Sequence, residues 1–590
     1  MMAGMDGIKS RTFFGLFTAV ALCTACSNRP DAKHGADEET VDGGTLVVGL
    51  AAEPETANVY LARRVESLVL ANRILPRLAA EVVPEEGRKG GYEAEFAVSW
   101  HFENEGKDLV VQLHEAQWSD GTPFECADAV FTHAAQIDPD LGWWGASAKR
   151  HITSVECRDP STVVYHYDSV YPGMFMDAND LHLLPRSIEN FPRKQWRTTD
   201  WEKEMPAAGP FRVATVARGQ EWVLERNEKY YASRGKPHLE RIVMRVVPDA
   251  TARITQLLSG DLDMITRIAP SDAARIEREH GLRLIRRSGW RYSYIGWNVV
   301  DPAAYETWRR SREAACESEN RSPCLEGSDE LAALPKRIPH PLLGDASVRR
   351  ALTMAIDRPS IINTLLLGEG EIPASPILSP LPEHDPKLMP LPFDPEQARR
   401  LLAEAGFRDT NGDGILEKKG RAFSITMGVQ AGRKVRRSAA EMIQNFLRDV
   451  GVKVEIRAIE NSFFYQNLNQ RKLDAWLAGW SASMRVDMTE MLYAGACAVG
   501  GRNFGCWSNE AADELALEAR ETVDQDQRAE LWRGWERIFR EQQPYTMLFR
   551  PHELIGVNAR IKGVESLIPT DPLHGVESWS MMSSNSGGAE

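Results

Sequence analysis

Residues 478–487 carry the side chains best suited to binding a small molecule. They read Ala-Gly-Trp-Ser-Ala-Ser-Met-Arg-Val-Asp and follow an apolar run, residues 473–477, that predicts a buried strand. Gly479 is expected to let the backbone turn after that strand. A large aromatic side chain can then cover an apolar ligand surface while two hydroxyls and an acid bind its polar groups. The four candidates are Trp480, Ser481, Ser483 and Asp487.

The elements predicted around this stretch indicate where it lies in the fold. They form a β-α-β-α-β unit made of strand 423–429, helix 434–449, strand 452–459, a short helix and the strand that ends at Trp480. Ligands bind beyond the carboxyl ends of the strands in such a sheet. A lone tryptophan can also close a core. Its place at a strand end nevertheless favours the rim of a cleft for Trp480 and Ser481.

The composition indicates a large globular protein. A chain of 590 residues with 43% hydrophobic content is too long for one core, so two or three compact units are expected. The formal net charge is -14, without long acidic runs. Lysine and arginine do not gather into a basic stripe, which argues against nucleic acid as a partner. A strand at 242–247, a helix at 253–258 and an apolar segment after it predict a mixed α/β body.

The start of the chain has the charged, apolar and small-residue regions of a secretory signal. Lys9 and Arg11 precede an apolar stretch, residues 13–23, that is too short to span a membrane as a folded anchor. The following Thr-Ala-Cys-Ser resembles a bacterial lipoprotein signal, in which Cys26 becomes the lipid-bearing first residue of the mature protein. We therefore predict a signal peptide at residues 1–25.

A lipidated tether is expected from residue 26 to residue 42, where the sequence is polar and lacks periodicity. The position three before Cys26 is Cys23, where such signals usually have an aliphatic residue. Each buried methylene of an attached acyl chain contributes about 0.8 kcal/mol to membrane binding. The anchor is thus the expected contact with the membrane.

Six cysteines remain once Cys23 and Cys26 are assigned to the signal and the lipid, because the chain has eight. An even number in an exported protein favours disulfides. The expected pairs are local in sequence: Cys126–Cys157, Cys316–Cys324 and Cys497–Cys506. Other connectivities are open, so this pairing is a hypothesis. The CxxC or HxxxH spacing of a zinc site does not occur among them.

Sequence patterns of known catalytic sites are missing from the chain. His114-Glu115 and His552-Glu553 begin like the helix of a zinc protease, but Trp118 and Gly556 stand where the second histidine is needed. The chain has no Gly-x-Ser-x-Gly elbow and no phosphate-binding loop. We therefore expect neither enzymatic activity nor a cofactor.

Residues 409–417 resemble the first part of a calcium loop. Asp409, Asn411 and Asp413 place side-chain oxygens at alternate positions. The twelfth position is Gly420 rather than a glutamate that would bind through both oxygens. A turn rich in Asx side chains is therefore the simpler interpretation, and calcium is the weaker alternative.

Several stretches together resemble the family-5 extracellular solute-binding proteins, the oligopeptide-, dipeptide- and nickel-binding partners of ABC importers. The matching stretches are residues 43–50 with Glu53-Pro54, 118–131, 209–211, 256–263, 348–358, Asn503-Phe504 and Pro544-Tyr545. Each one alone is weak. Their order and spacing from about Gly43 to Trp579 make the resemblance specific.

The resemblance implies an α/β fold, the two-lobed periplasmic-binding-protein clamshell (type II, class C-like) with an extra subdomain. Lobe one is expected at residues 43–78, 192–288 and 546–582, the inserted subdomain at 79–191, and lobe two at 289–545. Two crossings, near Gly289 and Tyr545, would make a hinge. Residues 301–341 are charged, contain two cysteines and predict a surface insertion that decorates lobe two.

The resemblance also extends the set of candidate ligand-binding residues. The additions are Tyr294, Trp297 and Asn298 near the crossing, Glu53 from lobe one, and Asn503. For Trp297-Asn298 an ordinary strand end is the alternative. Peptide-binding members resemble one another in having an aspartate three residues after the cleft tryptophan, where Ser483 stands here. A neutral hydroxyl cannot replace a charge-assisted contact, so recognition of a peptide amino terminus would depend on Asp487.

The function implied is that of a lipid-anchored, exported receptor on the periplasmic or cell-surface face of a bacterial membrane. It would capture a peptide or similar small solute between two closing lobes and deliver it, as a monomer, to an ABC-type permease. A sensory or chaperone-like lipoprotein and an exported hydrolase are the alternatives. The identity of the solute and the choice between inner and outer membrane stay open.

Overall fold

The computed structural model describes residues 40–83, 90–231, 235–318, 328–498, 500–566, 568 and 571–582. The predicted signal peptide, Cys26 and the tether up to residue 39 lie outside the described residues, and so does the pairing of Cys316 with Cys324. Among the described helices, none is both long enough and apolar enough to cross a membrane.

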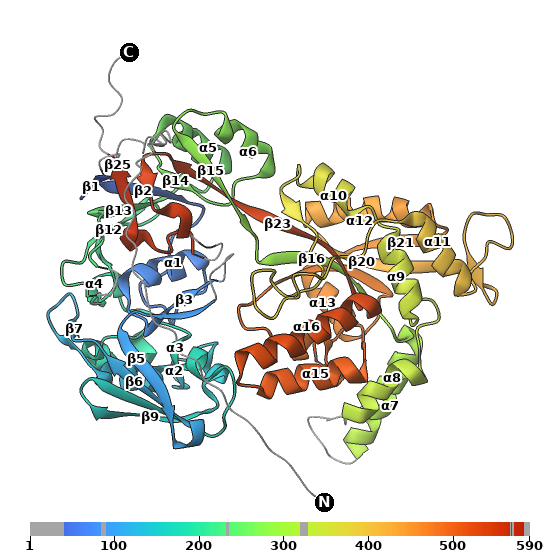
Figure 1. Ribbon diagram of the computed structural model, residues 1–590, viewed down its shortest axis with the longest axis horizontal. Coiled ribbons are helices and arrows are strands. Elements are labelled where there is room, and N and C mark those ends of the chain that lie inside the picture. The colour runs from blue at the N-terminus through green and yellow to red at the C-terminus, as the bar shows by residue number, and fades with distance from the viewer. Residues whose placement is uncertain are drawn as a thin grey trace, which may run out of the picture. The chain divides into compact units, whose positions relative to one another are not determined.

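Helices alternate with strands along most of the chain (Figure 1). The helices are α1 (Val65–Ile74), α2 (Cys126–Gln136), α3 (Met174–Asn179), α4 (Trp201–Glu204), α5 (Ala250–Ser259), α6 (Pro270–Glu277), α7 (Pro302–Ser318), α8 (Ser328–Arg337), α9 (Ala346–Met354), α10 (Arg358–Leu365), α11 (Pro395–Glu404), α12 (Lys434–Arg448), α13 (Asn461–Asn469), α14 (Thr489–Leu492), α15 (Glu510–Glu521) and α16 (Gln525–Gln542). Short strands form small sheets: β1 (Thr40–Val41), β25 (Ser580–Met582) and β24 (Ile561–Lys562); β3 (Ala79–Val82) and β4 (Gly91–Ala94); β7 (Ala116–Gln117) and β8 (Pro123–Phe124); β18 (Glu417–Lys418) and β19 (Arg421–Ala422).

A mixed 12-stranded sheet connects the main elements. Its order is β11 (Phe211–Ala217), β12 (Glu221–Arg226), β13 (Arg241–Val246), β2 (Thr45–Leu50), β14 (Met264–Ile265), β23 (Tyr545–Asn558), β16 (Arg291–Trp297), β22 (Ala475–Ser481), β20 (Ser424–Gln430) and β21 (Lys453–Ile459), with β15 (Leu282–Ser288) and β17 (Gly370–Glu371) also on β23. We use "lobe one" for the part that contains β2 and β15 and "lobe two" for the part that contains β16 and β22.

The long strand β23 belongs to both lobes. Residues Tyr545 to Phe549 pair with β16, whereas His552 to Asn558 pair with β15. Figure 1 shows β23, in red, running beside β16 and then beside β15. The strand therefore changes partner at Arg550–Pro551, whereas the sequence predicted this crossing near Tyr545.

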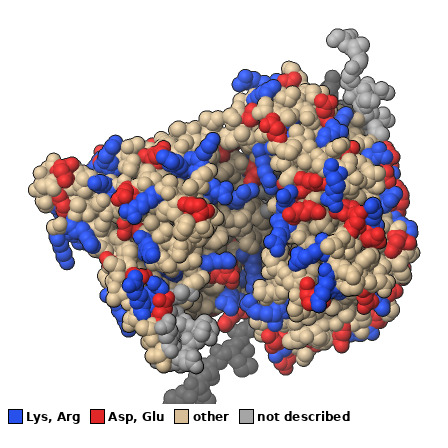
Figure 2. Space-filling view, turned by 180° about the vertical axis from the view of Figure 1, so that it is seen from behind, with Lys and Arg blue, Asp and Glu red and all other residues tan. Residues whose placement is uncertain are grey.

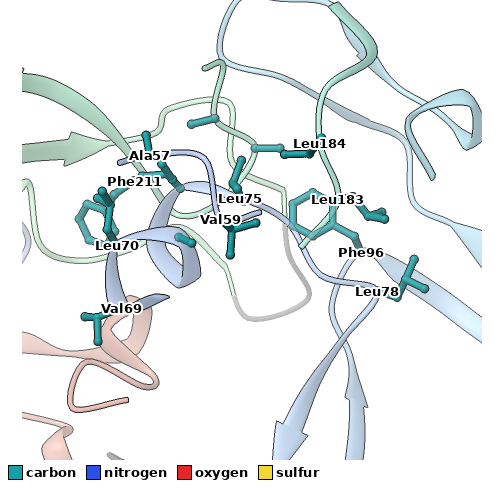
Figure 3. Close-up of a cluster of buried hydrophobic side chains, with 14 of the residues drawn as sticks. Ala57, Val59, Val69, Leu70, Leu75, Leu78, Phe96, Leu183, Leu184 and Phe211 are labelled. Carbon is teal, nitrogen blue, oxygen red and sulfur yellow. The ribbon is translucent and has the colours of Figure 1, made fainter. Parts of the chain in front are cut away.

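The inserted segment forms an antiparallel four-stranded sheet in the order β5 (Ala97–Glu103), β6 (Asp108–Leu113), β10 (Thr162–Tyr167) and β9 (Ile152–Asp159). The predicted disulfide between Cys126 and Cys157 joins α2 to β9, with the Cα atoms 5.7 Å apart. The insertion has no core of its own, because its buried apolar residues continue into lobe one. Figure 3 shows Phe96 and Leu183 of the insertion near Leu75 and Leu78.

The predicted β-α-β-α-β unit of lobe two is present. Strand β20 is parallel to both β21 and β22, and helices α12 and α13 connect them. Gly479 does not turn the chain, because it lies inside β22 opposite Ser293. A Cβ atom at this position would overlap the Arg436 guanidinium, so the glycine makes room for that side chain. The predicted turn at Gly479 was therefore wrong.

The segment predicted as a surface insertion at 301–341 contains the two helices α7 and α8. Tyr305 of α7 and Leu331 and Leu334 of α8 are buried in an apolar cluster of lobe two. Charged residues cover the outer face, where Arg309 pairs with Glu306 at 2.9 Å. The segment thus packs as part of the core as well as covering the surface.

Lys and Arg side chains are interspersed with Asp and Glu over the face shown in Figure 2. Such mixing agrees with the even distribution of charge along the sequence.

Candidate functional site

A cavity of about 590 Å³ lies at the carboxyl ends of β2 and β22. We call it the main cavity. Leu50 ends β2 and Ser481 ends β22, and both line it. Strand β2 is parallel to β13, and β22 is parallel to β20. Ligands of α/β proteins bind beyond the carboxyl ends of such parallel strands. The volume falls in the range of about 300–1,000 Å³ that is typical of small-molecule pockets.

The first crossing between the lobes supplies an aromatic side chain to the main cavity. Trp290 and Arg291 stand where the chain leaves β15 and begins β16, and both line it. The backbone N–H of Ala482 donates to the Trp290 carbonyl at 2.7 Å, which fixes the crossing to the end of β22. Val69 of α1 and Ile555 of β23 add apolar surface from lobe one.

Four charged side chains also line the main cavity. Arg267 pairs with Glu66 of α1 at 3.4 Å, and its backbone has a left-handed φ of 56°. A non-glycine residue in that region is strained, and such strain gathers at binding sites. Burial raises the pKa of Glu553, while the charges of Arg291 and Arg267 oppose the shift. The cavity therefore offers both signs of charge beside an indole.

A second cavity of about 500 Å³ adjoins the first and shares Arg291 with it. We call it the basic cavity. It lies at the start of α12, where Arg433, Lys434 and Arg436 line it, and Tyr292 supplies an aromatic wall.

Trp480 lies in β22 beside these cavities and is not sealed in the core. It pairs with Tyr292 across the strands and is half-buried against the apolar cluster of lobe two. The Arg502 guanidinium lies 5.7 Å from its ring centroid, which is close enough for a cation–π contact. The neighbouring Ser481 is exposed and lines the main cavity.

Ser483 and Asp487 lie in the loop after β22. The exposed Ser483 hydroxyl accepts the backbone N–H of Arg485 at 3.1 Å. Asp487 accepts the backbone N–H of Thr489, the first residue of α14, at 2.9 Å and the Thr489 hydroxyl at 2.5 Å. Asp487 lines a separate cavity of about 170 Å³ and not the main cavity.

Four of the predicted ligand-binding residues have buried side chains with internal partners. The exposed fractions are 1% for Tyr294, 1% for Trp297, 0% for Asn298 and 1% for Asn503. The Trp297 indole N–H donates to the Thr546 hydroxyl at 3.0 Å. Asn298 donates to the Arg471 and Leu473 carbonyls at 3.1 Å, as the strand-end alternative predicted. The structure does not bring these residues to the main cavity.

Asn503 and Glu53 each hold a loop. Asn503 donates to the Tyr493 and Trp507 carbonyls at 3.0 and 2.7 Å. Glu53 accepts the Gly219 backbone N–H and the Trp222 indole N–H, both at 3.1 Å. It thereby secures the β11–β12 hairpin and lines neither cavity.

Ser481 is the only predicted candidate among the described residues that line the main cavity, and the other lining residues were not predicted. Trp290 and Arg291 directly follow the predicted crossing at Gly289, which was the available signal. Glu553 was considered only as part of an incomplete zinc pattern. Its neighbour in that pattern, His552, hydrogen-bonds Glu369 at 3.2 Å instead.

The disulfide between Cys497 and Cys506 closes the loop after α14, with Cα atoms 4.9 Å apart. Two of the three predicted pairs are therefore present, and the third lies outside the described residues. The sequence pattern had left other connectivities open.

The possible calcium loop is an exposed turn. Asp409, Asp413 and Glu417 bring carboxylate oxygens within 4.8 Å of one another. Asp409 accepts the backbone N–H of Gly412 at 2.7 Å, and Asn411 donates to Glu417 at 2.8 Å. These bonds match the Asx-rich turn, and calcium binding stays a prediction.

Comparison with known proteins identifies relatives of the chain. The family model described as bacterial extracellular solute-binding proteins, family 5 Middle, matches residues 91–501. The chain is 27% identical over 576 residues to the oligopeptide-binding protein AppA of Bacillus subtilis (strain 168), covering 96% of this chain and 97% of the relative.

Solved structures share the fold. AppA from Bacillus subtilis in complex with a nonapeptide has a TM-score of 0.64 at 26% identity, covering 92% of this chain and 100% of that one. NikZ from Campylobacter jejuni in complex with Ni(L-His) has a TM-score of 0.65 at 21% identity, covering 91% and 99%. These matches confirm the predicted α/β, two-lobed clamshell fold. The chain belongs to family 5 of the bacterial extracellular solute-binding proteins.

Proposed function

We propose that the protein is a lipid-anchored receptor that binds a peptide or similar small solute in the main cavity and delivers it to an ABC-type permease. The observation that carries the proposal is the position of this cavity. Leu50 and Glu553 of lobe one line it. Ser481 of lobe two and Trp290, at the crossing between the lobes, line it as well. A ligand there contacts both lobes, which is what a closing receptor needs.

The relatives support a peptide as the solute class. AppA of Bacillus subtilis, which this chain resembles over nearly its whole length, is named as an oligopeptide-binding protein. The main and basic cavities together give room for an extended ligand with an aromatic wall and polar groups. Trp480, Ser481, Trp290 and Arg291 are the residues that we propose as ligand contacts, with Asp487 as a contact for longer ligands.

Closure follows from the energetics of a two-state receptor. A ligand shifts the balance between open and closed forms only by its difference in affinity for them. Contacts with residues of both lobes are complete only in the closed form, so binding favours closure. Water leaves the site at the same time, which strengthens each polar contact inside.

The amino-terminal signal supports attachment through Cys26. Replacing this residue, Cys26→Ala, is expected to release the protein from membranes while leaving solute binding intact. Mass spectrometry of the mature protein would show a lipid on Cys26 in the native chain. An unlipidated mature protein that is still membrane-bound would contradict the anchor.

The central experiment is mass spectrometry of the solute that co-purifies with the protein. We expect an intact peptide or small solute in one-to-one ratio. Adding the identified solute back to the stripped protein should raise its melting temperature, since ligands stabilise the state that they bind. Recovery of the solute unchanged after long incubation distinguishes a receptor from an exported hydrolase. Cleavage products in place of the solute would contradict the proposal.

A further inference from the structure

The basic cavity is lined by four cations: Arg291, Arg433, Lys434 and Arg436. No aspartate or glutamate among the described residues lines it, and none lies within ion-pair distance of these four side chains. Elsewhere in the chain arginines commonly pair with carboxylates, as Arg502 does with Glu490 at 2.8 Å. Four cations without a carboxylate partner at one cavity are therefore unusual for this protein and call for a functional explanation.

Arg436 is held in place by neutral groups. Its guanidinium donates to the Gln430 side-chain oxygen at 2.6 Å, and Gln430 in turn donates to Asn461 at 2.7 Å. Gln430 is buried, and Gly479 leaves space for the guanidinium against β22. Burial lowers the pKa of Arg436, and the charge of Arg433 lowers it further. A guanidinium that is oriented but not neutralised is prepared for an anion that arrives from outside.

The adjoining helix increases the positive potential. Helix α12 begins after Arg433, which makes no side-chain cap, and its first turn contains no acid. The amino end of a helix carries a partial positive charge that acidic residues normally balance. Here Lys434 and Arg436 add to that charge instead. A bound anion would relieve the repulsion.

The charge of the site is opposite to that of the whole protein. The main and basic cavities together are lined by five basic residues and two acidic ones, although the chain carries a net charge of -14. One of the acids, Glu66, is paired with Arg267 at 3.4 Å. Ser483 supplies no charge for a ligand ammonium group. Charge complementarity thus favours a negatively charged ligand.

We propose that the solute is an acidic, peptide-like anion with at least two negative charges, one of which binds Arg433 and Arg436 in the basic cavity. This inference rests on the proposed function, since it assigns a chemical class to the same solute. A free ammonium group is not required for its recognition.

Three probes that share a trialanine core test the charge preference. They are N-succinyl-trialanine with two carboxylates, trialanine as a zwitterion, and trialanine amide with one ammonium group. Isothermal titration of the stripped full-length protein should give an affinity for the succinyl probe that is at least about tenfold higher than for trialanine, the size of one charge-assisted contact. The amide should bind most weakly, and the succinyl affinity should fall as salt rises.

Variants assign the preference to the basic cavity. Arg436→Gln should lower the affinity for the succinyl probe by about tenfold or more. The same variant should bind the amide with nearly unchanged affinity. Arg433→Gln is a second variant at an exposed position, so its effect does not depend on core packing. Arg437→Gln is the matched control, because Arg437 is exposed on the same helix and pairs with Glu441 at 3.1 Å.

The outcomes separate the two proposals. Equal affinity for the three probes, or a preference for the amide, would contradict the proposal that the solute is acidic. The proposal that the protein is a solute receptor would still hold. A co-purified solute that none of the probes displaces also contradicts it. Equal losses of affinity for the succinyl probe in Arg436→Gln and Arg437→Gln would show that the basic cavity does not bind the ligand. If no solute co-purifies and no probe binds, the proposed function itself fails.

Discussion

Gly289 lies against Pro551 at the place where the two crossing strands leave lobe one. The Gly289 N–H donates to the Pro551 carbonyl at 3.1 Å, and a Cβ atom on Gly289 would overlap that oxygen. Both strand crossings are thus tied to each other by a backbone contact that only glycine allows. A hinge needs such a fixed point, around which a few backbone torsions change.

Replacing this glycine, Gly289→Ala, should destabilise the protein by about 1–3 kcal/mol, the usual cost of inserting an atom into a close-packed site. Chemical unfolding measures the change. Gly534→Ala in α16 is the matched control, because its Cβ would meet only the methyl end of Leu515 at 3.2 Å. Equal effects of the two substitutions would show that the contact with Pro551 has no special role.

Trp290 is expected to be a major ligand contact. Trp290→Ala should weaken binding of the co-purified solute about tenfold, because an aromatic contact removed from a cavity costs roughly 1–2 kcal/mol. Titration calorimetry measures the affinity. Trp144 is 73% exposed and lines neither the main cavity nor the basic cavity, so Trp144→Ala should leave affinity unchanged. A full-affinity Trp290→Ala protein would place the solute elsewhere.

Strand direction explains why the sequence indicates the crossing but not which of its residues line the main cavity. β16 is antiparallel to β22, so Arg291 pairs with Ser481 and Trp297 with Ala475. The start of β16 therefore meets the main cavity, and its far end is buried. The apolar pattern of a strand does not indicate its direction in the sheet. The antiparallel pairing of β16 with β22 is therefore needed to show which end of β16 faces the main cavity.

Local signals predicted the elements well where capping chemistry is explicit. Asp394 caps α11 and Asp524 caps α16, and aspartate is one of the residue types that favour this position. Asp345 caps α9 and accepts the Ser347 backbone N–H at 2.8 Å, although Ser347 is also a suitable capping residue by type. Two suitable caps stood close together there, and sequence alone could not choose between them.

The stability of the protein should depend on pH through Asp513. Burial raises the pKa of this α15 carboxyl from 3.8 to about 7, and its hydrogen bond from the Ala494 backbone N–H is long, at 3.3 Å. The folded state holds the proton more tightly than the unfolded state, so stability falls as pH rises from about 4 to about 7.

Asp513→Asn should remove this dependence and make the protein more stable than the native chain at pH 8. Melting temperatures measured across pH 4 to 8 give the comparison. A native protein whose melting temperature shows the same pH profile as the variant would mean that Asp513 is not the titrating group.

The two disulfides should differ in their contribution to stability. They close loops with sequence separations of 31 for Cys126–Cys157 and 9 for Cys497–Cys506. Loop-closure entropy predicts losses of about 4 and about 3 kcal/mol when each is removed. Denaturation of Cys126→Ser/Cys157→Ser and Cys497→Ser/Cys506→Ser proteins measures both. A larger loss for the shorter loop would show that loop entropy is not the dominant effect.

Closure of the two lobes over an intact solute is tested most directly by a distance measured between them. Spin labels on Ser154→Cys in β9 and Glu514→Cys in α15, both exposed positions, report that distance. We predict that adding the co-purified solute to the stripped protein shortens it, and that removing the intact solute restores it. An unchanged distance at saturating solute would contradict the account.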